Sequence, residues 1–263
     1  MGELVRQTIR VEWKALLGWT ISTLALLLAV AVFFPSIKDN AAITGGFDDL
    51  PPSVQAAFGI ADLGSATGYL QGQIFSTLGP LIFLSFAIGR GARAIAGEEE
   101  HGTMDLLLTN PIRRSRVVIE KGAAILVQLV ALAVVVWLAL VVLGPPFELD
   151  VGVGDLAAAT VSIAALGGLY GAIALCLSGA TGRRALSLGI TAGLAGAGYL
   201  YTALAPFVSS FRDHPGISPF QHGYGYDPLA NGMQWGNFLA LVVAAAVFVA
   251  GAVVLFDRRD VRA

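Results

Sequence analysis

Charged residues are scarce in this sequence, and their scarcity excludes an ordinary soluble domain. Only 13% of the 263 residues are Asp, Glu, Lys or Arg, against roughly 25% in average soluble domains. Hydrophobic residues make up 56% of the chain, and the mean hydropathy is +0.75. This composition is typical of an integral membrane protein. The net charge of −2 offers no basic surface for nucleic acid, so we expect no nucleic-acid partner.

Cysteine, histidine and catalytic motifs are also scarce. The single cysteine, Cys176, excludes a disulfide within the chain, and its place in an apolar run is typical of a small packing residue. His214 and His222 could in principle help to hold a metal ion, but loop histidines are more often plain polar residues. The sequence contains no HExxH, GxSxG or Walker A motif. We therefore predict no catalytic, metal or cofactor site, and no ATP hydrolysis by this chain alone.

Six apolar segments are long enough to cross a bilayer, which takes roughly 20 residues of helix. They are residues 16–34, 73–96, 122–143, 156–179, 185–207 and 237–256. We predict an all-α integral membrane protein with six transmembrane helices in a single transmembrane domain, residues 1–263. The first segment also resembles a cleavable signal peptide, but its apolar run exceeds the usual length of about 7–15 residues. We interpret it as an uncleaved signal anchor.

Glycine and proline predict local features of these spans. Pro80 should kink the second span. The spacings Gly167-x-x-x-Gly171 and Gly189-x-x-x-Gly193 favour close helix packing in the fourth and fifth spans. Residues 208–236 are too polar to cross, and any part that re-enters the outer leaflet must be shielded by protein.

The basic residues predict the orientation in the membrane. With both termini in the cytoplasm, all 16 Lys and Arg residues except Lys38 and Arg212 lie on the inner side. We therefore expect a multi-pass protein of the cell membrane. Residues 2–15 have the spacing of an amphipathic helix that lies on the inner leaflet, although a solvated stub remains an alternative. The residues expected to contact membrane lipid there are Arg6, Arg10, Trp13 and Lys14.

The predicted spans lack Asp, Glu, Lys, Arg and His at mid-membrane depth. One such charge costs about 2.5–3.5 kcal/mol on an insertion scale and is usually kept for a function. Proton- or sodium-coupled carriers normally need a titratable or coordinating group near the midplane, whereas this chain offers only hydroxyls, backbone and Gln128. A channel or secondary carrier is therefore disfavoured, and energy for transport should come from another protein.

One charged segment, residues 97–121, separates the second and third spans. It opens with three acids, continues with a short apolar ridge and closes with an arginine cluster, which suits the two ends of a helix dipole. One interpretation is a solvated loop whose charges only set the topology. The other is a docking helix whose Met and Leu side chains fill a groove on a cytoplasmic partner.

The same segment resembles the signature of permease subunits of type-2 ATP-binding-cassette (ABC-2 type) exporters. That pattern reads roughly G-E-E-x-x-G-T-x-x-x-L-L-x-x-P-x-x-R, followed by a Lys. The matching residues are Gly97, Glu98, Glu99, Gly102, Thr103, Leu107, Leu108, Pro111, Arg114 and Lys121. The resemblance implies that residues 97–121 are a cytoplasmic coupling segment between spans 2 and 3, in which the stretch around Glu98–Leu108 forms the coupling helix.

The resemblance further implies that two permease subunits pair, as two copies or as paralogues, and that each docks on a separate ABC ATPase subunit. ATP and Mg²⁺ would bind that ATPase, and the substrate, which an apolar lining suggests is amphiphilic or hydrophobic, would pass between the permeases. The expected ATPase-coupling residues are Glu98, Glu99, Gly102, Thr103, Met104, Leu107, Leu108, Pro111 and Arg114. The alternative function is a membrane scaffold or assembly protein that docks a cytoplasmic partner without transport.

Overall fold

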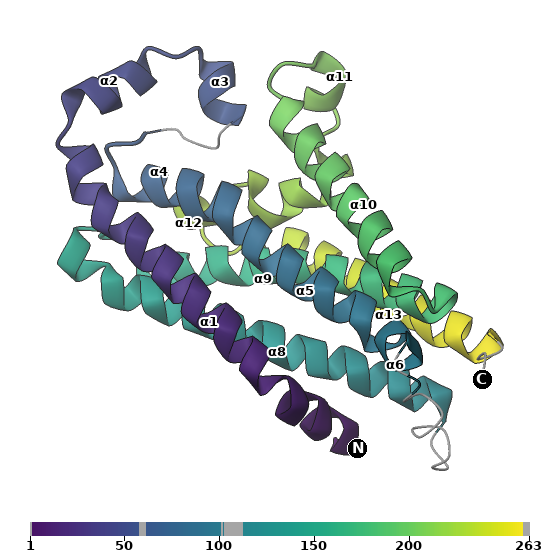
Figure 1. Cartoon of the computed structure of the whole chain (residues 1–263). Coiled ribbons are helices and arrows are strands. Elements are labelled where there is room, and N and C mark those ends of the chain that lie inside the picture. The colour runs from purple at the N-terminus through teal and green to yellow at the C-terminus, as the bar shows by residue number, and fades with distance from the viewer. Residues whose placement is uncertain (1, 58–61, 101, 103–112, 260–263) are drawn as a thin grey trace.

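The computed structural model describes residues 2–57, 62–100, 102 and 113–259. The regular structure of these residues is helical, and none of them forms a strand, as the sequence predicts. The long helices run side by side as a bundle (Figure 1). Three short helices lie beyond one end of it: α2 (Ala41–Asp48), α3 (Pro52–Ala57) and α11 (Ser209–Arg212).

The first helix, α1 (Glu3–Lys38), is one unbroken element of 36 residues. The predicted interfacial helix at 2–15 and the predicted span at 16–34 are therefore not separated by a break. Nothing between them is a strong helix breaker, since Gly18 alone only weakens a helix. At about 1.5 Å per residue, α1 is roughly 54 Å long, which exceeds the hydrocarbon thickness of about 30 Å.

The second apolar stretch folds as three consecutive pieces. These are α4 (Ala66–Leu70), the π-helical segment η1 (Gln71–Leu78) and α5 (Gly79–Ala94). Pro80 lies in the first turn of α5, where its missing N–H is tolerated. The Gly79 N–H donates to the Ile74 carbonyl, five residues back. A π-helical segment thus lies directly before Pro80, at the place where the sequence predicts a kink.

The remaining predicted spans correspond to α8 (Arg114–Leu143), α9 (Val153–Thr181), α10 (Arg184–Leu204) and α13 (Trp235–Arg258). Within the described residues, five helical stretches are long and apolar enough to cross a membrane. They are Val5–Lys38, Ala66–Ala94, Arg114–Leu143, Val153–Thr181 and Trp235–Arg258. The helix α10 is not among them, because Gly, Ser and Thr interrupt its apolar residues. The predicted count of six spans thus stays a prediction.

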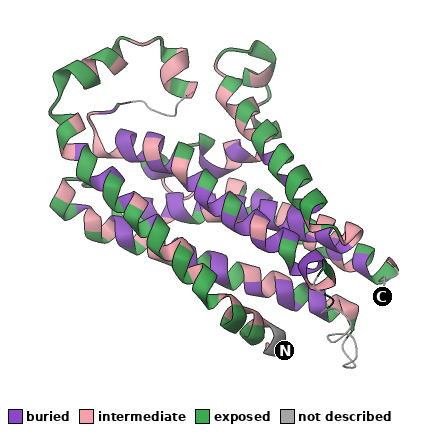
Figure 2. Ribbon diagram, viewed as in Figure 1, coloured by how far each residue is buried: buried purple, intermediate pink, exposed green. Residues whose placement is uncertain are grey.

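The centre of the bundle is formed by α5 and α9. In the most apolar stretch of each of these two helical regions, 67% of the residues are buried, against 11% in that of α13. Figure 2 shows the buried residues concentrated along α5 and α9. Glycines permit this approach, because a Cβ on Gly91 would overlap the backbone oxygen of Gly171. Gly171 and Gly167 therefore pack closely, as predicted. Gly189 and Gly193 of α10 face open space in this chain.

The turn-rich segment after α10 folds back against the bundle. It contains η3 (Pro215–Ile217), the π-helical η4 (Gln221–Gly225) and α12 (Pro228–Asn231). Both η4 and α12 contact α9, and Phe220 and Leu229 are each only 2% exposed. Protein thus covers Phe220 and Leu229, whereas η3 has no buried residue and Ile217 is 69% exposed.

Candidate functional site: the charged end of the bundle

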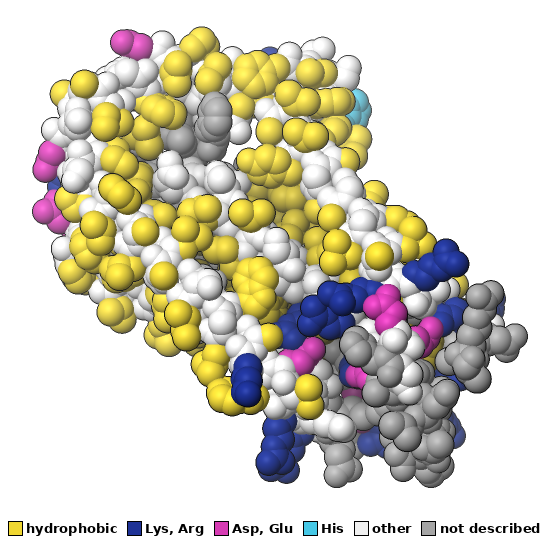
Figure 3. Space-filling view, in the orientation of Figure 1, with side chains coloured by type: hydrophobic (Ala, Val, Ile, Leu, Met, Phe, Trp, Pro, Cys, Tyr) yellow, Lys and Arg dark blue, Asp and Glu magenta, His cyan; other side chains and the backbone are white. Residues whose placement is uncertain are grey.

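Charged side chains gather at the end of the bundle that carries both termini (Figure 3). The N-terminal end of α1, the short helix α6 (Ala96–Glu100), the start of α8 and the C-terminal end of α13 meet there (Figure 1). The rest of the surface seen in this view is mostly apolar or uncharged. The chain therefore presents one strongly polar end, which includes the described parts of the charged segment 97–121.

A buried hydroxyl holds the junction between α5 and α6. Ser178 of α9 donates through Oγ to the Ala92 carbonyl at 3.0 Å and accepts from the Ala96 N–H at 2.9 Å. The Ser178 side chain is fully buried, so each of these hydrogen bonds satisfies a backbone group that water cannot reach. The start of α6 is thereby fixed to α9.

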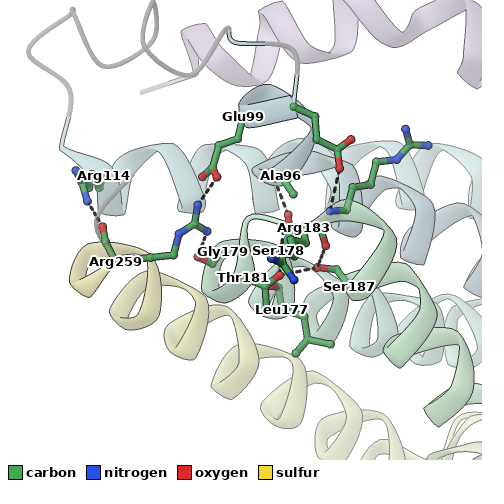
Figure 4. A network of polar contacts seen from close by, with 12 residues as sticks. Ala96, Glu99, Arg114, Leu177, Ser178, Gly179, Thr181, Arg183, Ser187 and Arg259 are labelled. Atoms are coloured by element: carbon green, nitrogen blue, oxygen red, sulfur yellow. Dashed lines mark hydrogen bonds and ion pairs between the residues drawn. The ribbon is translucent and has the colours of Figure 1, made fainter. Parts of the chain in front are cut away.

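A second contact set joins α6 to the C-terminal end of α13 (Figure 4). Arg259 forms an ion pair with Glu99 and donates to the Gly179 carbonyl at 2.9 Å. The Arg259 carbonyl accepts from Arg114 at 2.6 Å. Gly182 makes room for this arrangement, because it has a φ of +62° and a Cβ there would overlap Arg259 and Glu99. Four helices, α6, α8, α9 and α13, therefore meet at Arg259.

The other two glutamates of α6 are also engaged within the chain. Lys121 of α8 donates to Glu98 at 2.6 Å, and Glu100 accepts from the Arg184 N–H of α10 at 3.2 Å. Glu98, Glu99 and Glu100 therefore attach α6 to three different helices. That Glu98 and Glu99 also serve as docking residues for a partner stays a prediction.

A polar layer connects α1, α5 and α8 one turn deeper. Glu12 of α1 forms an ion pair with Arg90 of α5 and accepts a hydrogen bond from Gln128 of α8 at 3.1 Å. Arg90 is 7% exposed, and its guanidinium lies 5.3 Å from the Phe86 ring centre, within the range of a cation–π contact. Nη1 of Arg90 is the atom paired with Glu12, and among the described residues Nη2 makes no hydrogen bond.

A cavity of about 270 Å³ opens beside this layer. Its charged and polar lining residues are Thr8, Glu12, Arg90, Arg93, Glu98 and Lys121. Among the described lining residues, three cations thus face two carboxylates.

The predicted site residues fall into three groups. Arg6, Arg10, Trp13 and Lys14 are exposed on α1. Glu98, Glu99 and Arg114 lie in the contacts described above, and Gly102 has a φ of +67°. The positions outside the described residues are Thr103, Met104, Leu107, Leu108 and Pro111.

Sequence reasoning placed Arg90 and Arg259 on the inner side but did not predict their contacts, and it did not single out Glu12. A signal for Glu12 was present, because helical spacing places it on the same apolar stripe as Ile9 and Leu16. A carboxylate on a buried stripe needs a cation as partner. For Arg259 no comparable signal exists, since its partner Glu99 is 160 residues away in sequence.

The structure describes no metal centre. Among the residues that it describes, no group of three His, Cys, Asp or Glu side chains lies close enough to hold a metal ion. His222 instead contacts the Asn237 side chain at 2.8 Å and the Gly216 carbonyl at 3.1 Å. His214 contacts the Ser210 carbonyl at 3.3 Å. Both histidines are thus used in local hydrogen bonds.

Several apolar helices of spanning length, joined to one charged end, define a multi-pass membrane protein. A family model described as ABC-2 family transporter protein matches residues 5–261. The chain belongs to this family, whose membrane proteins work in general with a partner ATPase subunit. No curated protein sequence matches the chain.

Proposed function

We propose that the chain is the membrane-spanning permease subunit of an ATP-driven ABC exporter, located in the cell membrane with both termini in the cytoplasm. The observation that carries this proposal is the ABC-2 family match over residues 5–261. In this function the chain itself hydrolyses no ATP. A separate ATPase subunit binds ATP and Mg²⁺ and drives the transport cycle. A second permease, identical or paralogous, completes the pathway, and α10 serves as the sixth span.

The coupling role of residues 97–121 is supported by what holds both ends of that segment. On one side α6 is attached to α8, α10 and α13 through its three glutamates. On the other side Arg114, at the start of α8, binds the Arg259 carbonyl. A displacement applied by an ATPase between residues 100 and 114 therefore acts on several long helices at once. In this proposal Glu98 and Glu99 anchor the segment, while Met104, Leu107 and Leu108 make the contact with the ATPase.

The complex with the ATPase tests this proposal directly. Leu107→Asp puts a charge at the expected contact, so it should weaken binding of the partner ATPase by about 2 kcal/mol, or roughly thirtyfold. Substrate-stimulated ATP hydrolysis of the reconstituted complex should fall with it. Leu107→Asp is a sharper test than Glu98→Lys, because the latter also breaks the ion pair with Lys121.

Ala230→Asp is the matched control, since Ala230 is exposed on α12, away from the charged end. The control variant should bind the ATPase normally and support substrate-stimulated hydrolysis. A complex that Leu107→Asp leaves intact would contradict the proposed contact. A complex that forms but shows no substrate-dependent hydrolysis would indicate a scaffold instead of a transporter.

A further inference from the structure

The cavity between α1, α5 and α8 has the properties of a built anion site. Its cations come from two helices, because Arg90 and Arg93 lie on α5 and Lys121 lies on α8. Glu12 and Thr8 of α1 form the opposite wall. At about 270 Å³ the cavity is slightly smaller than most small-molecule sites, which begin at roughly 300 Å³. It suits a compact charged group better than a large organic molecule.

Arg90 provides the observation that points to a ligand. A guanidinium carries five N–H donors in a planar fork, and that of Arg90 is 93% removed from solvent, since the residue is only 7% exposed. Nη1 of Arg90 is the atom that pairs with Glu12, whereas Nη2 has no hydrogen-bond partner in the described part of the chain. Buried donors of this kind are costly unless an acceptor reaches them. The Arg90 side chain faces the cavity, where an anionic oxygen would supply that acceptor.

The charge balance of the lining favours the same kind of ligand. Glu12 offsets Arg90, and Glu98 offsets Lys121, which still has two further ammonium donors. Arg93 then adds one cation at the exposed rim. Two arginine forks and an ammonium match the tetrahedral oxygens of a phosphate group, which accepts several charge-assisted hydrogen bonds at once.

We propose that the cavity of Arg90, Arg93 and Lys121 binds a phosphate group. Arg90 and Lys121 would hold the phosphate oxygens from inside, and Arg93 would close over the group from the rim. The phosphate can be the headgroup of an anionic membrane lipid or a soluble phosphate, since the chemistry of recognition is shared. This inference requires neither the ATPase partner nor transport, so it can fail or succeed independently of the proposed function.

Three probes separate the sources of the phosphate. The purified full chain in neutral detergent is titrated with phosphatidylglycerol, with diacylglycerol, which lacks the phosphate, and with inorganic phosphate. Binding is followed by native mass spectrometry and by the melting temperature. Saturable binding of phosphatidylglycerol without binding of diacylglycerol supports a lipid headgroup site. Saturable binding of inorganic phosphate supports the soluble source, and binding of neither phosphate probe overturns the proposal.

Two variants test the residues. Arg93→Gln removes a donor at the exposed rim and should weaken binding about tenfold without affecting folding. The double variant Glu12→Gln with Arg90→Gln keeps the polar layer neutral and should abolish binding while the melting temperature of the empty protein is retained.

Arg10→Gln is the matched control, because it removes the same charge from an exposed position on α1 that does not line the cavity. Its affinity should stay within about twofold of the unchanged protein. Equal weakening by Arg10→Gln and Arg93→Gln would show only general attraction to a basic surface and would overturn the site. Unchanged phosphate binding by the double variant of Glu12→Gln and Arg90→Gln would also overturn the site.

Discussion

At the scale of single residues, Arg259 connects several helices at the charged end, although it lies outside the family signature. Its side chain is 20% exposed and contacts both Glu99 and the Gly179 carbonyl, while its own carbonyl accepts from Arg114. The Glu99 side chain is only 13% exposed. A carboxylate in such surroundings depends on its cation, because an unpaired buried charge is much less stable than a hydrated one.

We expect Arg259→Ala to destabilise the protein. Truncating one partner of a buried pair costs about 3–5 kcal/mol, and the partial exposure of Arg259 places the expected loss at the low end, about 3 kcal/mol or less. The melting temperature in detergent should fall by several degrees. The neighbouring Arg258 is exposed, so Arg258→Ala should leave the melting temperature nearly unchanged.

Combining Arg259→Ala with Glu99→Ala should recover part of the stability, since the stranded carboxylate is then gone. If the double variant melts lower than Arg259→Ala alone, the ion pair is not the source of the effect. Equal melting temperatures for Arg258→Ala and Arg259→Ala would likewise contradict this account.

At the scale of helices, the packing of α5 against α9 depends on glycines. A Cβ on Gly91 would overlap the Gly171 carbonyl oxygen and would come within 2.9 Å of Ala174. Gly91→Ala should therefore push the two central helices apart and destabilise the protein by about 1–3 kcal/mol. The melting temperature in detergent measures the effect.

Gly189→Ala in α10 is the control for this change. Open space surrounds Gly189, so an alanine there should leave stability unchanged or raise it by up to about 1 kcal/mol, because alanine favours a helix more than glycine does. If Gly189→Ala lowers the stability as much as Gly91→Ala does, the close approach of α5 and α9 is not the cause of the effect.

The helices could be predicted from the sequence because long apolar runs leave little choice of structure. Their ends and pairings could not. The continuity of α1 was missed because an amphipathic start and an apolar span look like separate elements, although both are helical. The π-helical segments at Gln71–Leu78 and Gln221–Gly225 have no periodic signal. The pairing of Glu12 with Arg90 depends on which helices become neighbours, and local spacing does not contain that information.

At the scale of the whole molecule, the sixth crossing can be tested by labelling. In a Cys176→Ala background, single cysteines replace the exposed residues Ala185, in the first turn of α10, and Ser210, in α11 beyond the other end of α10. Exposed Ser36 and Asp257 provide reference positions for the outer and inner sides. A membrane-impermeant maleimide should label Ser36→Cys and Ser210→Cys on intact cells. Ala185→Cys and Asp257→Cys should react only after permeabilisation.

This pattern follows from the distribution of the basic residues, which should remain in the cytoplasm. Labelling of Ala185→Cys and Ser210→Cys from the same side would mean that α10 does not cross. Labelling of Asp257→Cys on intact cells would reverse the proposed orientation.

The unbroken α1 has a mechanical consequence. The helix has no proline before Pro35, near its C-terminal end, and sharp kinks are rare without proline or a π-bulge. A rigid rod of roughly 54 Å acts as a lever, since a tilt of about 10° about one end moves the other by about 9 Å. Glu12, near one end, contacts Arg90 of α5, and Lys38, at the other, contacts Glu148 beyond α8. If α1 moves as a rigid body, a small rotation at the charged end also displaces the end that carries Lys38 and its contact with Glu148.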